Sequence, residues 1–230
     1  MALSDAEAAR YARQLILPGY VPATQEFLRA ARVHVVGAGE VAGPALLYLA
    51  SAGVGTVLVD DAHDLAPEDA ASWLYGGGEV GQPRIYAAIA AVRAATSLCK
   101  VRPHATGSNP TAALICLASP GTAREAANQA RLAGLPHVVA LAAGDDGEVV
   151  SVPVGAPCYQ CASRLAIGTV ARPGALAAAV GALAALELLQ ILGGLSEGAG
   201  GRRVDLTRGQ PRTRQSVRVA GCACGRPRAA

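Results

Sequence analysis

The sequence predicts an α/β fold, a Rossmann-like, doubly wound and mainly parallel sheet with helices on both faces and an antiparallel C-terminal extension. Short apolar runs alternate with segments of helical length, as at residues 33–36, 57–59, 113–118 and 137–142. Such runs, apolar on both faces, are typical of parallel strands that are covered on both sides. A glycine-rich turn, GAGEVAG, directly follows the first run, which is how a nucleotide-binding βαβ unit begins.

The segments on either side of this turn also have the patterns of helices and strands. DAEAARYARQ predicts a short helix over residues 5–14 with Asp5 in its first turn, and residues 23–31 predict a second helix. After the turn, ALLYLASAG predicts the helix that leads to the strand at 57–59. The alternation continues with helices expected at residues 83–96 and 122–132.

Beyond residue 143 the pattern becomes antiparallel. Asp146 and Gly147, between two apolar runs, are a hairpin signal. A long Ala/Leu helix is expected from residue 175, followed by strands in RRVDLT and TRQSVRV. The 230 residues contain no repeat and no low-complexity linker, so we expect one domain. Its parts are an N-terminal helical arm (1–31), a Rossmann core (32–145) and a C-terminal hairpin, long helix and cysteine-bearing tail (146–230).

Composition argues against several classes of function. The net charge is +3 and aromatic residues make up 3% of the chain, so there is little on which nucleic-acid bases could stack. The N-terminus is polar and charged, unlike a signal peptide. The apolar stretch 175–192 contains Glu187 and Gln190, as a buried helix does more often than a membrane span. We therefore expect a cytoplasmic protein with neither membrane nor nucleic acid as partner, whose six cysteines need not form disulfides.

The glycine turn predicts a nucleotide site. Gly37 allows the tight turn between strand and helix, and Gly39 lets a ligand approach the backbone. Asp60 ends the next strand, where a carboxylate can accept hydrogen bonds from ribose hydroxyls. The pattern does not distinguish NAD, ATP and SAM.

The cysteines predict a structural zinc site. Cys158 and Cys161 lie in one short loop, and Cys222 and Cys224 lie about sixty residues further on. Four thiolates on two short loops suit a tetrahedral zinc ion without a catalytic role. The alternative is that these thiols are free or paired in disulfides.

Several phrases occur in the order typical of one family. They are RYARQLILPGY, GAGEVAGPALLYLASAGVGTVLVDD, VGQPR, PCYQC and the terminal CAC. Over residues 7–225 the chain resembles the ThiF/MoeB/HesA adenylyltransferases, bacterial relatives of the ubiquitin-activating enzymes. The resemblance implies that ATP and magnesium activate the C-terminal glycine of a ubiquitin-like sulfur-carrier protein as an acyl-adenylate.

Position by position, the chain departs from most of that family's phosphate site. Glu40 stands where the family has a second glycine, Glu68 falls near its asparagine, and Ala71 falls near its arginine. Arg84 replaces the lysine of the GQPK phrase and keeps its charge. Ser119 falls where the resemblance implies a magnesium-binding aspartate. The phosphate end of the site is therefore expected to disfavour magnesium-bound ATP.

Arg13, within RYARQ, matches an arginine that in this family reaches the phosphates of the partner subunit's site. It is either that residue or a surface arginine on a helix that docks a second copy. We expect a homodimer, held partly by the helix around residues 11–14 and by the long helix from residue 175.

Three functions remain open from the sequence. The residue content favours a degenerate relative that has lost or strongly reduced adenylation and acts as a dimeric scaffold or carrier-protein partner. Family resemblance favours an active adenylyltransferase whose candidate catalytic residues are Arg84 and Arg13. The third possibility is a binder of another nucleotide, such as NAD or AMP, in the same cleft.

Overall fold

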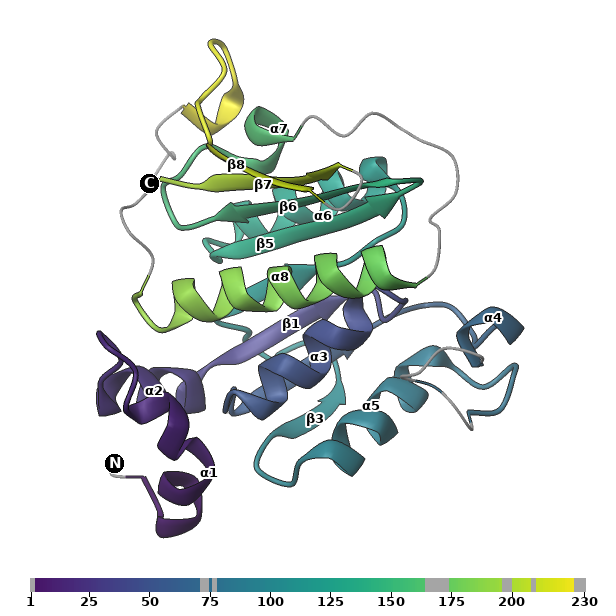
Figure 1. The fold of residues 1–230 in the computed structure, drawn as a ribbon. Helices are drawn as coiled ribbons and strands as arrows, with labels where there is room; N and C mark the ends of the chain where they lie inside the picture. The colour runs from purple at the N-terminus through teal and green to yellow at the C-terminus, as the bar shows by residue number, and fades with distance from the viewer. Residues whose placement is uncertain are drawn as a thin grey trace.

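The computed structural model describes residues 3–70, 75, 78–163, 174–195, 200–207 and 210–225. Their strands form one eight-stranded sheet in the order β3-β2-β1-β4-β5-β6-β7-β8 (Figure 1). The strands are β1 (Arg32–Val36), β2 (Thr56–Asp60), β3 (Lys100–Pro103), β4 (Ala112–Ile115), β5 (His137–Ala143), β6 (Asp146–Val152), β7 (Arg202–Thr207) and β8 (Gln210–Gln215).

The sheet is parallel from β3 to β5 and antiparallel from β5 to β8. This confirms the predicted fold class, a mainly parallel sheet with an antiparallel C-terminal extension. The chain builds outward from β1 in one direction through β2 and β3, and in the other through β4 and β5. A strand order that reverses in this way leaves a crevice at the carboxyl ends of the central strands.

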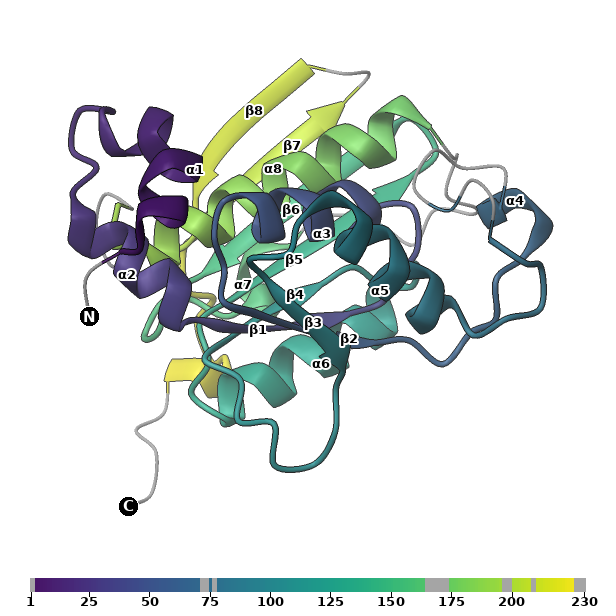
Figure 2. The same ribbon diagram turned by 90° about the horizontal axis from the view of Figure 1, so that it is seen from below.

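Helices cover both faces of the sheet, as the apolar runs predict. Figure 2 shows α3, α5 and α8 on one side of the sheet and α6 on the other. Two buried clusters result, a larger one beneath α3, α5 and α8 and a smaller one beneath α6 and α7. The helices are α1 (Asp5–Leu15), α2 (Pro22–Ala30), α3 (Ala42–Ser51), α4 (Pro67–Ala70), α5 (Arg84–Ala95), α6 (Pro120–Leu132), α7 (Tyr159–Ala162) and α8 (Ala175–Leu192).

Two edge strands differ from the sequence expectation. The strand β3 is not anticipated by any apolar run, because three of its four residues are exposed. The second C-terminal strand lies earlier in the chain than the expected segment TRQSVRV. It ends at Gln215, and all six residues of β8 are exposed. Edge strands with exposed side chains carry no hydrophobic pattern, so their limits are set by pairing with the neighbouring strand.

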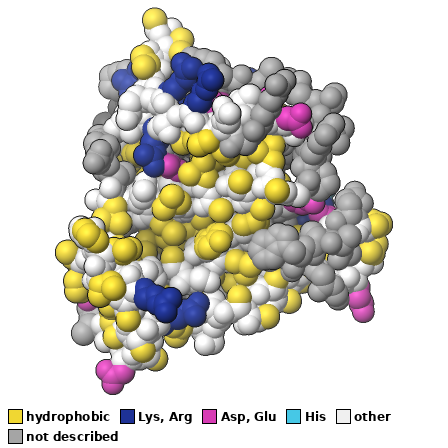
Figure 3. All heavy atoms as spheres, viewed as in Figure 1, with side chains coloured by type: hydrophobic (Ala, Val, Ile, Leu, Met, Phe, Trp, Pro, Cys, Tyr) yellow, Lys and Arg dark blue, Asp and Glu magenta, His cyan; other side chains and the backbone are white. Residues whose placement is uncertain are grey.

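The helix α8 is long and apolar enough to cross a membrane by composition, with a mean hydropathy of 2.0. In the structure it packs against α3, β5 and β6. Its one carboxylate, Glu187, is buried and accepts a hydrogen bond of 2.7 Å from Nε of Arg202 on β7. Leu186 of α8 is 49% exposed, and Figure 3 shows apolar side chains gathered in a band across this face of the molecule.

Candidate functional site

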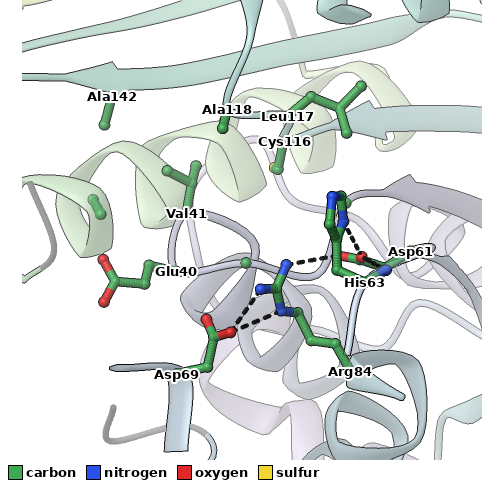
Figure 4. A pocket seen from close by; sticks show the side chains of 13 residues that line it. Glu40, Val41, Asp61, His63, Asp69, Arg84, Cys116, Leu117, Ala118 and Ala142 are labelled. Carbon is green, nitrogen blue, oxygen red and sulfur yellow. Dashed lines mark hydrogen bonds and ion pairs between the residues drawn. The ribbon is translucent and has the colours of Figure 1, made fainter. Parts of the chain in front are cut away.

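A pocket of about 380 Å³ lies at the carboxyl ends of the central parallel strands. Its walls are the glycine turn after β1, the segment after β2, α4, the start of α5, the segment after β4, and single alanines of β5 and α8. Figure 4 shows the side chains that line it. The position agrees with the crevice that the strand order predicts.

The glycine turn has the geometry that a nucleotide-binding turn needs. Gly37 has φ +88°, and a Cβ there would lie 2.4 Å from the carbonyl oxygen of Cys116, so only glycine fits. The hydroxyl of the buried Tyr75 side chain donates to the carbonyl oxygen of Ala38 and so helps to hold the turn in place. Gly37 and Gly39 both line the pocket, as predicted.

The carboxylate that enters the pocket is Asp61 and not its neighbour Asp60. The side chain of Asp60 is 54% exposed and lies 3.4 Å from Nε2 of His34, outside the pocket lining. Successive residues of an extended chain point to opposite faces, so one step along the chain moves the carboxylate across the sheet. The order of residues alone could not decide between the two.

Asp61 is tied to the turn and to the segment that follows it. Its Oδ2 accepts a 2.7 Å hydrogen bond from the amide of Ala38, and its Oδ1 accepts one of 2.8 Å from the amide of His63. Burial alone would raise the pKa of Asp61, but these amides, the His63 ring and the charge of Arg84 together hold that pKa below its usual value. Asp61 is therefore a stable negative charge within the pocket.

Arg84 is held by two carboxylates. Its Nη2 lies 2.6 Å from Oδ2 of Asp69, and its Nη1 lies 3.3 Å from Oδ2 of Asp61 (Figure 4). Burial alone would lower the pKa of Arg84, but the bond to Asp69 and the two negative charges raise it. The sequence identified Arg84 and missed Asp69, which lies one position beyond Glu68. The positive charge of Arg84 is therefore already balanced inside the protein.

The segment after β4 offers no carboxylate to the pocket. Its lining residues are Cys116, Leu117 and Ala118. Ser119, which was expected there, instead caps α6 by accepting a hydrogen bond of 3.2 Å from the amide of Gly121. Burial raises the pKa of the Cys116 thiol to about 12, so this thiol stays protonated and is a poor nucleophile.

The remaining predicted positions differ in how they relate to the pocket. Glu40 lines it from the turn before α3, as expected. Arg13 is exposed on α1 and is not part of the lining. Ala71 and the side chain of Glu68 lie outside the described residues.

The four predicted zinc ligands converge at the far end of the sheet. The Sγ of Cys158 lies 3.7 Å from those of Cys161 and Cys222, and the Sγ of Cys161 lies 3.6 Å from that of Cys224. Sulfurs at about 2.3 Å from a tetrahedral zinc ion are about 3.8 Å apart. A disulfide would require about 2.05 Å. The cluster can therefore hold a zinc ion, and no disulfide links these thiols.

Comparisons with known proteins agree with the fold and the turn. A sequence model of the ThiF family matches residues 11–224. Adenylyltransferase and sulfurtransferase MOCS3 of Bos taurus is 35% identical over 223 residues, 87% of this chain and 49% of that protein. The molybdopterin-synthase adenylyltransferase of Escherichia coli K12 is 31% identical over 253 residues, 97% of this chain and 98% of that protein.

Solved structures give the same fold. That of E. coli MccB has a TM-score of 0.77 at 18% identity, covering 96% of this chain and 73% of that one. The chain spans about half the length of the MOCS3 relatives that it matches.

Proposed function

The chain belongs to the ThiF family, and from this we propose that it is a member with lost or strongly reduced ATP-dependent adenylation, a dimeric scaffold or partner of a ubiquitin-like sulfur carrier. Its family is that of the MoeB-like adenylyltransferases. The observation that carries the proposal is the pairing of Arg84 with Asp61 and Asp69 in a pocket that Glu40 also lines.

The charge of the pocket lining supports the proposal. The lining holds three carboxylate side chains, those of Glu40, Asp61 and Asp69, and one guanidinium, that of Arg84. At an effective dielectric constant near 20, a like charge ~4 Å from a phosphate costs roughly 4 kcal/mol before solvent reduces it. A phosphate that approached Arg84 would also have to displace Asp69. The residues present therefore do not fit magnesium-bound ATP.

The nucleoside part of the site supports a second candidate function. The turn at Gly37 and Gly39 is intact, Asp61 lies beside it, and the opposite wall is apolar. These features suit a ribose and a base, so AMP or NAD remains a candidate ligand. AMP and NAD each bring fewer phosphate groups than ATP to the acidic end of the pocket.

The four clustered cysteines, Cys158, Cys161, Cys222 and Cys224, are proposed to hold one structural zinc ion. The ion would supply four metal–sulfur bonds between two distant parts of the chain and no reactive group. For Arg13, which is exposed on α1, we propose a place on the dimer surface.

An ATP–pyrophosphate exchange assay with a ubiquitin-like carrier tests the loss of adenylation. We expect exchange no higher than that of a blank without protein, because the phosphate end of the pocket is negative. Measurable exchange that disappears in Arg84→Ala and persists in Arg124→Ala, an exposed arginine on α6, would restore the active-enzyme reading.

A further inference from the structure

Asp60, the carboxylate that points away from the nucleotide pocket, lies beside two histidines on the other face of the sheet. The parallel register pairs Val36 of β1 with Asp60 of β2, and His34 lies two residues before Val36. Residues two apart on a strand point to the same face, so His34 and Asp60 share one face. His104 follows β3, and its amide donates to the carbonyl oxygen of Val59 at 2.8 Å. This bond continues the pairing of β2 with β3 and places His104 next to Asp60.

Solvent can reach these three side chains. Val36, on the same face, packs against the smaller buried cluster, but α6 on this side of the sheet packs against β4 and β5. The side chain of Asp60 is 54% exposed and that of His34 is 17% exposed. His104 is half-buried. A cation can therefore reach this group of side chains and keep water among its ligands.

The donor atoms have nearly the spacing of a metal site. Nε2 of His34 lies 3.4 Å from Oδ2 of Asp60, and the rings of His34 and His104 stack with their centroids 3.8 Å apart. One nitrogen of each ring and one oxygen of Asp60 all lie within 4.8 Å of one another. Nitrogen and oxygen ligands at about 2.0–2.2 Å from a tetrahedral zinc ion are about 3.3–3.5 Å apart. The His34–Asp60 pair already has this spacing, and rotations of the accessible His104 and Asp60 side chains bring the third ligand to it.

The chemistry of the three donors selects the kind of cation. Two imidazoles and a carboxylate suit a late first-row divalent ion such as zinc, whereas magnesium prefers oxygen ligands. Burial, and after it the ring of His104, lowers the pKa of His34 against the opposing effect of Asp60. The ring of His34 is therefore neutral near neutral pH and keeps a lone pair for a metal ion.

We propose that His34, Asp60 and His104 form a second metal site, which binds one zinc ion per chain and shares no residue with the cysteine cluster. Three protein ligands leave a coordination position for water. The ion joins β1 and β2 to the edge strand β3, three of whose four residues are exposed. The site also adjoins the glycine turn, because the amide of Gly37 donates to the carbonyl oxygen of Asp60 at 2.7 Å.

The test is isothermal titration of the intact protein, its cysteine cluster loaded beforehand, with Zn²⁺ and with Mg²⁺ in a buffer that binds neither ion. We expect one further zinc ion per chain, and magnesium binding weaker by at least about tenfold because two of the donors are nitrogens. Asp60→Asn and His104→Asn should each weaken binding of this zinc ion by at least about tenfold, since each removes a ligand. His63→Asn removes a histidine that is 73% exposed, and it should leave the binding unchanged.

A second readout identifies the ligands without any variant. The chain has four histidines, whose ring nitrogens can be followed by long-range ¹H–¹⁵N NMR. The further zinc ion should shift the ring resonances of His34 and His104 and leave those of His63 and His137 in place. The proposal is overturned if no further ion binds, or if the ion binds Asp60→Asn and His104→Asn as tightly as the wild type. Equal weakening by His63→Asn, or a shift of His63 in place of His34 and His104, would also overturn it, since the ion would then bind elsewhere on the surface.

Discussion

Asp69 holds the guanidinium of Arg84 more closely than Asp61 does, at 2.6 Å against 3.3 Å. Both carboxylates are nearly buried, so salt and solvent screen these pairs weakly. A phosphate would have to replace Asp69 as the partner of Arg84 in the presence of Glu40. At the scale of single residues, Glu40 and Asp69 are therefore the two side chains whose removal should restore affinity for ATP.

We predict that the double variant Glu40→Gly/Asp69→Asn binds ATP at least about tenfold more tightly than the wild type. The variant removes two negative charges and releases Arg84, each charge being worth up to roughly 4 kcal/mol before solvent screening. Calorimetric titration with ATP measures the change. Asp64→Asn, an exposed aspartate that is not part of the pocket lining, is the matched control. Equal ATP affinity in all three proteins would contradict the electrostatic explanation.

Asp61 should contribute to stability in a way that depends on pH. Its pKa in the folded protein lies below the ordinary value of 3.8, so the unfolded chain binds the proton more readily. The contribution is then complete above about pH 5 and is lost as pH falls through the ordinary pKa toward the folded one. We predict that Asp61→Asn lowers the free energy of unfolding by about 1–3 kcal/mol at pH 7. Urea unfolding should show the difference shrinking below about pH 4, whereas a constant difference would show that charge is not the cause.

Two candidate positions could be located from the sequence to within one residue, and the remaining error has a physical reason. The sequence places the carboxylate and the strand-end position at Asp60 and Ser119. The structure lines the pocket with Asp61 and Ala118. Side chains of neighbouring residues point in different directions on a strand or helix, and only the packed structure decides which of them enters the pocket.

At the scale of elements, α8 and α3 meet through glycine. A Cβ on Gly181 of α8 would lie 2.0 Å from the carbonyl oxygen of Val41, which precedes α3. The two helices can approach this closely only because position 181 has no side chain. The contact also helps to position the glycine turn relative to α8, since Val41 lies four residues after Gly37 and lines the pocket.

We predict that Gly181→Ala destabilises the protein by about 1–3 kcal/mol, although alanine is the better helix former, because the added methyl group overpacks the contact. Thermal unfolding measures the effect. Gly121→Ala on α6 is the control, since a Cβ there meets only Oγ of Ser119 at an ordinary 3.5 Å. If Gly181→Ala melts at or above the wild-type temperature, the two helices are not as closely packed as described.

The elements that the sequence anticipates are those with buried faces. The central strands and α8 have apolar patterns because packing requires them, whereas β3 and β8 have exposed side chains and no such pattern. The convergence of the four cysteines follows from spacing and metal chemistry, so it was predictable without the fold. The salt bridges of Arg84 were not, because Asp61, Asp69 and Arg84 lie on separate segments of the chain that only the fold brings together.

At the scale of the whole molecule, the apolar face formed by α3 and α8 suits a second copy of the chain. Leu186 of α8 is 49% exposed and Tyr48 of α3 is 57% exposed, and these two helices pack against each other. Figure 3 shows the band of apolar side chains to which this face belongs. Apolar patches of this kind on a folded protein commonly mark an interface.

We predict a dimer mass by light scattering at micromolar concentration, and dissociation at least about tenfold easier for Tyr48→Glu and Leu186→Glu, since each places a charge in an apolar contact. Leu132→Glu, on α6 across the sheet, is similarly exposed at 59% and should leave the dimer unchanged. A monomeric wild type, or equal dissociation in all the variants, would show that this face is not the interface.

The cysteine cluster joins two points 64 residues apart, Cys158 and Cys222, so a bound ion would close a loop that contains α8, β7 and β8. If this closure restricts the unfolded chain as a disulfide does, it contributes about 4 kcal/mol. We predict that a strong chelator, or Cys222→Ser with Cys224→Ser, lowers the melting temperature and makes the C-terminal third the first part to be cut by protease. An unchanged cleavage pattern would argue against a stabilising metal ion at this cluster. The working lifetime of this protein would then depend on the supply of zinc in its surroundings, so that a shortage of the metal would mark the chain for degradation before any other part of it had failed.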